Sequence, residues 1–142
     1  MNGILITDKP LGMSSARAVA YVKKRVRAAK AGHAGALDPF ATGLLIIGIN
    51  QGTRLSRFFL QGEKTYQARL YLGVETDTQD PTGRVISPGI PPEQIRISTR
   101  TVEAVLKQFE GFIQQVPPVY SALKHKGVPL YKLARQGRPV QK

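Results

Sequence analysis

The feature that most constrains this fold is a glycine-rich stretch that leads directly into an uninterrupted apolar run. Residues 32–43 read GHAGALDPFATG, and their three glycines and one proline favour an ordered loop over a helix or strand. Residues 44–49 read LLIIGI and contain no polar side chain. A run of that length predicts a strand that is buried on both faces. The sequence therefore predicts an ordered loop followed at once by a strand.

The rest of the first half predicts one more strand and two helices. Residues 3–7 are apolar and suit a strand that ends at a turn containing proline and glycine. Ser14 or Ser15 can cap a helix that runs to about residue 30, with Gly32 as its stop. Residues 51–60 suit a short helix.

The second half predicts short elements joined by turns. Residues 65–72 alternate between two faces, which is the period of a strand, and residues 84–87 could return as a second strand. Residues 101–109 carry apolar side chains at helical spacing. A strand over 111–116 and a short basic helix over 130–136 complete the pattern. Together these elements predict an α+β fold, a mixed or antiparallel sheet with packed helices, in one domain over residues 1–142.

The charge of the chain is large, positive and unevenly distributed. The formal net charge is +12 and the sequence pI is about 10.4. Between Asp8 and Glu63 the only carboxylate is Asp38, whereas nine lysines and arginines fall in that segment. Such a surplus predicts a polyanionic partner. Nucleic acid is favoured over a membrane because the chain has no basic amphipathic anchor, and a merely solvated surface would leave the segregation unexplained.

The residues that are absent exclude several classes of protein. The chain has no cysteine, which excludes disulfides, thiol nucleophiles and cysteine-based zinc sites and fits a reducing cytoplasm. It has only two histidines, His33 and His125, and no acid cluster joins them, so we expect no metal. It has no apolar run long enough for a transmembrane helix, and its first ten residues do not resemble a signal peptide.

Asp38, in the middle of the glycine-rich loop, is the candidate for chemistry. An aspartate before a proline often only bonds to nearby backbone amides and closes a turn. Three observations favour a reactive carboxylate instead. It is alone in a basic segment, glycines on both sides allow another molecule to approach, and nearby cations would keep it ionised as a nucleophile or base.

Five other side chains have both a structural and a functional interpretation. His33 could be a structural histidine or one that contacts RNA. Tyr66 could be a half-buried aromatic residue or a platform on which an extruded base stacks, and Tyr120 and Tyr131 have weaker claims to the same role. Lys9 could belong only to a turn, or it could bring a cation beside the Asp38 loop.

Four motifs in a fixed order resemble one known family. Residues 8–15 are similar to its opening motif and residues 32–43 to its catalytic loop. Residues 64–66 and 117–124 match two further signatures, which Tyr131, Ala134 and Arg135 continue. The family is TruB, the bacterial tRNA pseudouridine synthases that act on the uridine of the T-loop. The resemblance covers the whole chain.

The resemblance implies a role for particular residues. Asp38 would be the catalytic aspartate, Tyr66 would stack on the flipped uracil, His33 would help to hold the extruded T-loop, and Lys9 would support the active-site loop. Lys64 and Arg135, which lie in the matching signatures, would contact the RNA. It also implies a pseudouridine synthase-like catalytic fold and a tRNA T-arm as partner, with no metal or organic cofactor, and we expect a monomer.

The sequence departs from the family in two places and leaves two mechanisms open. Ala34 stands where the family commonly has threonine, and family members continue past residue 142 with a tyrosine–arginine segment and a small RNA-binding domain. The resemblance therefore implies that residues 1–142 are the N-terminal portion of the catalytic domain, truncated at the C-terminus. Asp38 could attack ribose C1′ or remove the 2′ proton to give a glycal. The rival hypotheses are a non-catalytic basic RNA-binding protein and a structural protein of a ribonucleoprotein particle.

Overall fold

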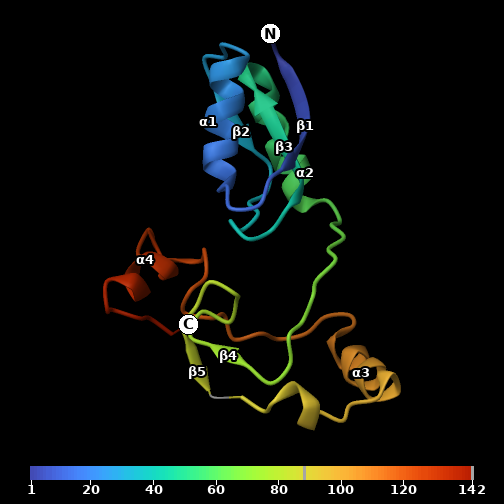
Figure 1. The fold of residues 1–142 in the computed structure, drawn as a ribbon. Coiled ribbons are helices and arrows are strands. Elements are labelled where there is room, and N and C mark those ends of the chain that lie inside the picture. The colour runs from blue at the N-terminus through green and yellow to red at the C-terminus, as the bar shows by residue number, and fades with distance from the viewer. Residues whose placement is uncertain (88, 142) are drawn as a thin grey trace. The chain divides into compact units, whose positions relative to one another are not determined.

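A computed structural model describes residues 1–87 and 89–141 of the chain, which divide into two compact units (Figure 1). The N-terminal unit is Met1–Ala68 and the C-terminal unit is Arg69–Lys142. Both combine helices with antiparallel strand pairs, so the predicted α+β class is confirmed. The expectation of one catalytic domain over residues 1–142 stays a prediction.

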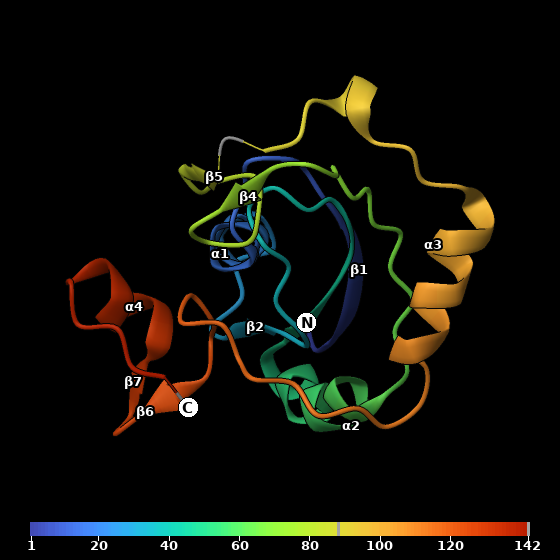
Figure 2. The same cartoon turned by 90° about the horizontal axis from the view of Figure 1, so that it is seen from below.

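The N-terminal unit is a three-stranded antiparallel sheet with a helix on one face. Its strands are β1 (Gly3–Lys9), β2 (Ala31–His33) and β3 (Gly43–Ile49), in the order β1-β3-β2. The helix α1 (Ser15–Arg25) lies along the sheet, and Figure 2 shows it end-on. The core that joins them contains Ala18, Leu45, Ile47 and Ile49.

The central strand is buried on one face more completely than on the other. Because side chains alternate along a strand, Leu45, Ile47 and Ile49 point toward α1 and pack there. Leu44 points the other way and is 64% exposed. The prediction of a strand buried on both faces is therefore wrong at its first residue. The second face is covered only toward the other end of the strand, where η1 (Asn50–Leu55) approaches Gly48.

Helix α1 ends earlier than the sequence predicted. The Ser14 hydroxyl accepts a hydrogen bond from the Arg17 amide and caps the start of the helix, as expected. The end falls at Arg25 rather than near residue 30, because Arg27 adopts a left-handed φ of 51°. The amides of Arg27 and Ala28 then bond back to the carbonyls of the last turn, a Schellman ending. Gly32, predicted as the stop, lies inside β2 instead.

The predicted helix over residues 51–60 is confirmed as η1 followed by α2 (Ser56–Gln61). η1 is a 3-10 helix that crosses the sheet face opposite α1. The approach is close: a Cβ on Gly48 would lie 2.8 Å from the Thr53 backbone, and one on Gly52 would overlap the Gly3 carbonyl oxygen. Glycine at both positions therefore allows η1 to sit directly on the sheet.

The C-terminal unit contains short elements. They are β4 (Glu75–Thr76), β5 (Val85–Ser87), η2 (Pro92–Gln94), α3 (Thr99–Leu106), η3 (Lys107–Phe109), β6 (Lys124–His125), β7 (Val128–Pro129) and α4 (Leu130–Arg135). Strand β4 pairs with β5, and β6 pairs with β7. In the part of the chain that the structure describes, no helix is long and apolar enough to cross a membrane.

Two predicted strands are wrong, and two predicted helices are confirmed. Residues 65–72 and 111–116 form no strand, although 65–72 alternates as a strand should. A strand needs a neighbour for its backbone N–H and C=O groups, and among the described residues β5 pairs with β4 instead. The helices predicted over 101–109 and 130–136 form as α3 with η3 and as α4.

Candidate active site

The Asp38 loop connects two strands that are already neighbours in the sheet. It leaves β2 at His33 and enters β3 at Gly43. The Ala34 amide donates to the Ile46 carbonyl, which continues the strand pairing one residue into the loop. Gly35 and Gly43 have φ values of 121° and 112°, a region that favours glycine. The loop is therefore a fixed connection with glycines at its two bends.

A buried serine of α1 holds the residue before Asp38. The Ser15 hydroxyl accepts a hydrogen bond from the Leu37 amide at 2.8 Å and donates one to the Leu37 carbonyl at 3.0 Å. Ser15 is only 4% exposed. The sequence predicts this serine only as a possible helix cap and does not predict its contact with the loop. No local signal would have revealed it, because residues 15 and 37 meet only through the packing of α1 on the sheet.

The carbonyl of the residue after Asp38 is held by the turn that follows β1. The Pro39 carbonyl accepts from the Gly12 amide at 2.7 Å and, more weakly, from the Lys9 ammonium at 3.5 Å. Lys9 is 1% exposed, and its ammonium also donates to the carbonyls of Met13 at 2.6 Å and Pro10 at 3.0 Å. A buried ammonium needs partners for its three N–H groups, and these carbonyls supply them.

Asp38 itself is exposed, between two anchored neighbours. Its backbone carbonyl accepts from the Ala41 amide at 3.0 Å and closes the turn. Its carboxylate makes no hydrogen bond or ion pair with the residues that the structure describes. The turn is therefore made by backbone atoms, and the side chain does not close it as an aspartate before proline often does. Both carboxylate oxygens can meet a ligand.

His33 lies at the end of β2, half-buried and paired with Ile47. Its Nδ1 is buried and has no hydrogen-bond partner among the described residues. Lys64 and Tyr66 lie beyond α2 in an irregular segment. The Lys64 ammonium donates to the carbonyls of Leu60 and Gly62 and so caps the end of α2. The Tyr66 side chain is 68% exposed and is not in the strand that the sequence predicted.

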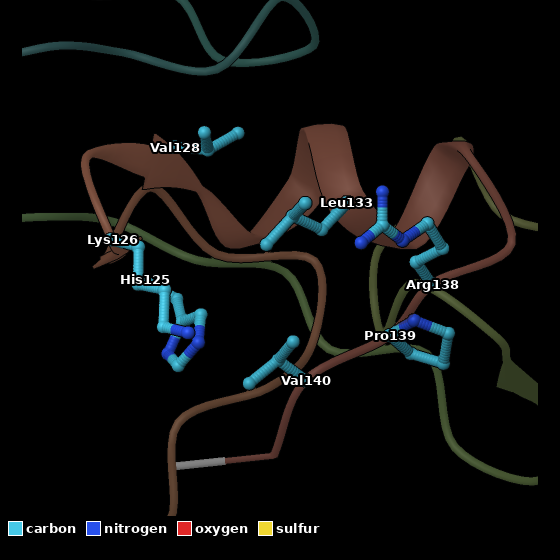
Figure 3. Close-up of a pocket in the computed structure, with 7 residues that line it drawn as sticks. All are labelled: His125, Lys126, Val128, Leu133, Arg138, Pro139 and Val140. Carbon is cyan, nitrogen blue, oxygen red and sulfur yellow. The ribbon is translucent and has the colours of Figure 1, made fainter.

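Arg135 belongs to the C-terminal unit, on α4, where its guanidinium lies 5.7 Å from the centre of the Tyr131 ring. That unit has a cavity of about 400 Å³ near the β6–β7 hairpin (Figure 3). Its lining combines basic and apolar side chains: His125, Lys126, Val128, Leu133, Arg138, Pro139 and Val140. Of the predicted site residues, the structure thus joins Lys9 to the Asp38 loop and leaves Lys64 and Tyr66 elsewhere in the N-terminal unit.

No group of three or more histidine, aspartate and glutamate side chains is placed to hold a metal ion within residues 1–87 and 89–141. In the C-terminal unit, the pKa of Asp80 is below its ordinary value of 3.8. Partial burial raises this pKa, but hydrogen bonds from Thr82, Thr78 and the Gly83 amide lower it by more. The Thr82 amide and hydroxyl lie 2.8 Å and 2.6 Å from one Asp80 carboxylate oxygen, so this aspartate, unlike Asp38, is committed to its own loop.

Comparison with known proteins gives consistent matches. A family model described as TruB family pseudouridylate synthase, N-terminal domain, matches residues 23–142. The chain is 45% identical to the tRNA pseudouridine synthase B of Geobacter sulfurreducens over 142 residues, 100% of this chain and 46% of the relative. It is 47% identical to that of Syntrophotalea carbinolica, again over 100% of this chain and 45% of the relative. The chain thus spans about half the length of these relatives.

Two solved structures share the fold. A crystal structure of a Cbf5-Nop10-Gar1 complex matches with a TM-score of 0.57 and 27% identity, over 86% of this chain and 31% of that one. A crystal structure of the archaeal box H/ACA sRNP Nop10-Cbf5 complex matches with a TM-score of 0.51 and 28% identity, over 88% of this chain and 34% of that one.

Proposed function

The chain belongs to the TruB family of pseudouridylate synthases, and we propose that it forms the N-terminal part of an enzyme that converts a uridine of the tRNA T-loop to pseudouridine. Asp38 is the reacting carboxylate. The observation that carries the proposal is the exposed Asp38 side chain, unpaired among the described residues, on a loop whose Leu37 and Pro39 backbones are fixed. An aspartate with only a structural role in this turn would be expected to hydrogen-bond to nearby backbone amides through its carboxylate, and within the described part of the chain Asp38 does not.

The reaction is an isomerisation with balanced bonds. The bond from ribose C1′ to uracil N1 breaks, the base rotates, and a bond from C1′ to C5 forms, while C5 loses its proton to solvent and N1 takes one up. No electrons are gained or lost, so the proposed reaction needs no redox cofactor. Asp38 either attacks C1′, as a carboxylate does in retaining glycosidases, or removes the 2′ proton to give a glycal.

The anchored loop contributes positioning. When a reacting group is displaced by about 1 Å, the reaction can slow by about a hundredfold. The contacts that fix the backbone on both sides of Asp38 prevent such a displacement. Ser15 holds one side, and Lys9 with Gly12 holds the other. In this proposal Lys9 acts through the Pro39 carbonyl and is a positioning residue.

The basic surface supplies the grip on RNA. The N-terminal unit has ten lysines and arginines and three carboxylates. Lysines and arginines that contact phosphates position a nucleic acid without reading its sequence. Extruding the target base from its stack costs about a few kcal/mol. The favourable phosphate contacts offset that cost. Within this proposal His33 and Tyr66 hold the extruded nucleotide, and Lys64 and Arg135 contact the RNA. The protein works as a monomer in the cytoplasm.

The test is the release of tritium from tRNA that carries 5-tritiated uridine, measured with the whole protein. Asp38→Asn keeps the size of the side chain but removes its charge, so we expect tRNA binding to persist and tritium release to vanish. Glu103→Gln, an exposed carboxylate on α3, is the matched control and should release tritium at the wild-type rate. Substantial release by Asp38→Asn would rule out the assigned role.

The rival is a basic protein that binds RNA without modifying it. The uneven charge of the chain favours RNA binding in either case, so charge alone does not separate the two. The same assay does: a wild-type protein that binds tRNA and releases no tritium would be a binding protein, and Asp38→Asn would then change nothing.

A further inference from the structure

The N-terminal unit has a cationic site at one end of its sheet, and the Asp38 loop lies at the other end. A cavity of about 360 Å³ there is lined by Ala29, Lys30, Asn50, Gln51, Thr53 and Arg54. It lies where Ala31 and Gly3 both pair with Ile49, whereas the Asp38 loop enters β3 at Gly43. The seven residues of β3 separate the two ends by about 20 Å at the usual rise of a strand.

The frame of this cavity is built around Asn50, whose backbone and side-chain polar groups are all hydrogen-bonded to neighbouring residues. The Asn50 amide donates to the Lys30 carbonyl at 2.8 Å, and the Asn50 side-chain oxygen accepts from the Lys30 amide at 3.0 Å. The Asn50 side-chain nitrogen donates to the Met1 carbonyl, and the Asn50 carbonyl accepts from the Thr53 hydroxyl at 2.8 Å. Asn50 has a left-handed φ of 50°, which these four bonds hold in place.

The side chains of the two cations that line the cavity take no part in these hydrogen bonds. The side chains of Lys30 and Arg54 are exposed, and neither makes a hydrogen bond or ion pair with residues 1–87 or 89–141. No carboxylate lines the cavity. Two cations with no internal counter-ion, held beside a neutral polar floor, attract an anion with several acceptor oxygens. A phosphate group has that chemistry.

We propose that Lys30 and Arg54 bind a backbone phosphate of the RNA whose target nucleotide reaches Asp38. This inference rests on the proposed function, because the ligand is the same RNA. The strongly basic surroundings favour RNA over a free anion: Arg25 is the last residue of α1, Arg27 follows it in the turn before Lys30, and both are exposed. The separation of about 20 Å means that only an RNA extending well beyond the target nucleotide fills both sites.

The experiment measures how tRNA affinity of the whole protein depends on salt. Each phosphate contact contributes about 0.7–0.9 to the slope of log affinity against log salt. The double variant Lys30→Gln/Arg54→Gln removes one phosphate contact, so it should reduce the magnitude of the slope by about 0.7–0.9 and weaken binding by about tenfold at low salt. The control Arg100→Gln/Lys107→Gln removes two cations from the C-terminal unit and should change the slope less. Equal changes in the two variants would overturn the inference.

Three further measurements distinguish a lost phosphate contact from unfolding, from an effect on catalysis and from the binding of another anion. A thermal melt of the double variant that matches wild type shows that binding is lost without unfolding. The turnover number at saturating tRNA should be unchanged, because the site is remote from Asp38. If instead inorganic phosphate or a poly-glutamate peptide binds at Lys30 and Arg54 in wild type while the tRNA slope of the double variant is unchanged, the site takes another anion and the inference fails.

Failure of this inference is distinct from failure of the proposed function. Wild-type protein that releases no tritium, together with the expected drop in slope, leaves the phosphate site standing and refutes the enzyme. Normal tritium release with an unchanged slope leaves the enzyme standing and refutes the phosphate site.

Discussion

Replacing Ser15 by alanine tests whether the Asp38 loop is held by α1. The change removes a hydroxyl that is 4% exposed and that bonds both the amide and the carbonyl of Leu37. A buried backbone group that loses its partner costs about 1–3 kcal/mol, so two such groups cost about 2–4 kcal/mol after partial relaxation toward water. The free energy of unfolding should fall by that amount in urea denaturation.

The matched control is Ser14→Ala, one residue earlier in the chain. Ser14 caps the same helix through the Arg17 amide at 3.2 Å but does not contact the loop. Losing a helix cap costs about 1 kcal/mol. Ser15→Ala should therefore destabilise the protein more than Ser14→Ala, and it alone should slow tritium release from tRNA, by about 10-fold to 100-fold if Asp38 shifts by as much as 1 Å. Equal losses of stability together with wild-type turnover in both variants would refute the reasoning.

Three smaller predictions concern backbone geometry and charge. Arg27→Gly should be more stable than Arg27→Ala by about 1 kcal/mol, measured by urea denaturation, because only glycine avoids the cost of the left-handed φ at this position. Gly48→Ala should cost about 1–3 kcal/mol, because the new Cβ would lie 2.8 Å from backbone atoms of Thr53. The pKa of Asp80 is below 3.8 in the folded protein, so its contribution to stability is complete above the unfolded pKa near 3.8 and is lost as pH falls through the folded value. An NMR titration should find that Thr82→Val raises this pKa.

The predictions that succeeded rest on local patterns. The apolar run at residues 44–49 forms β3 and Ser14 caps the start of α1, because strand propensity and helix capping depend mainly on residues that are close in the sequence. The alternation of residues 65–72 failed because alternation needs a partner strand, and the described residues offer none. The end of α1 failed because an arginine occupies the left-handed position that the sequence reading expected of glycine.

The same distinction explains what the sequence could tell about Asp38. Its isolation among cations and its flanking glycines are visible in the sequence and singled it out. The supports of the loop are not visible there: Ser15 meets Leu37 only because α1 packs on the sheet, and Lys9 reaches the loop only because β1 pairs with β3. A carboxylate can be kept free for a ligand only if other groups close its turn. In this chain the Ala41 amide closes the turn, and Ser15 of α1 and Lys9 of β1 hold the residues on either side of Asp38. The candidate residue of the loop was therefore visible in its own sequence, whereas the contacts that hold the loop depend on the fold.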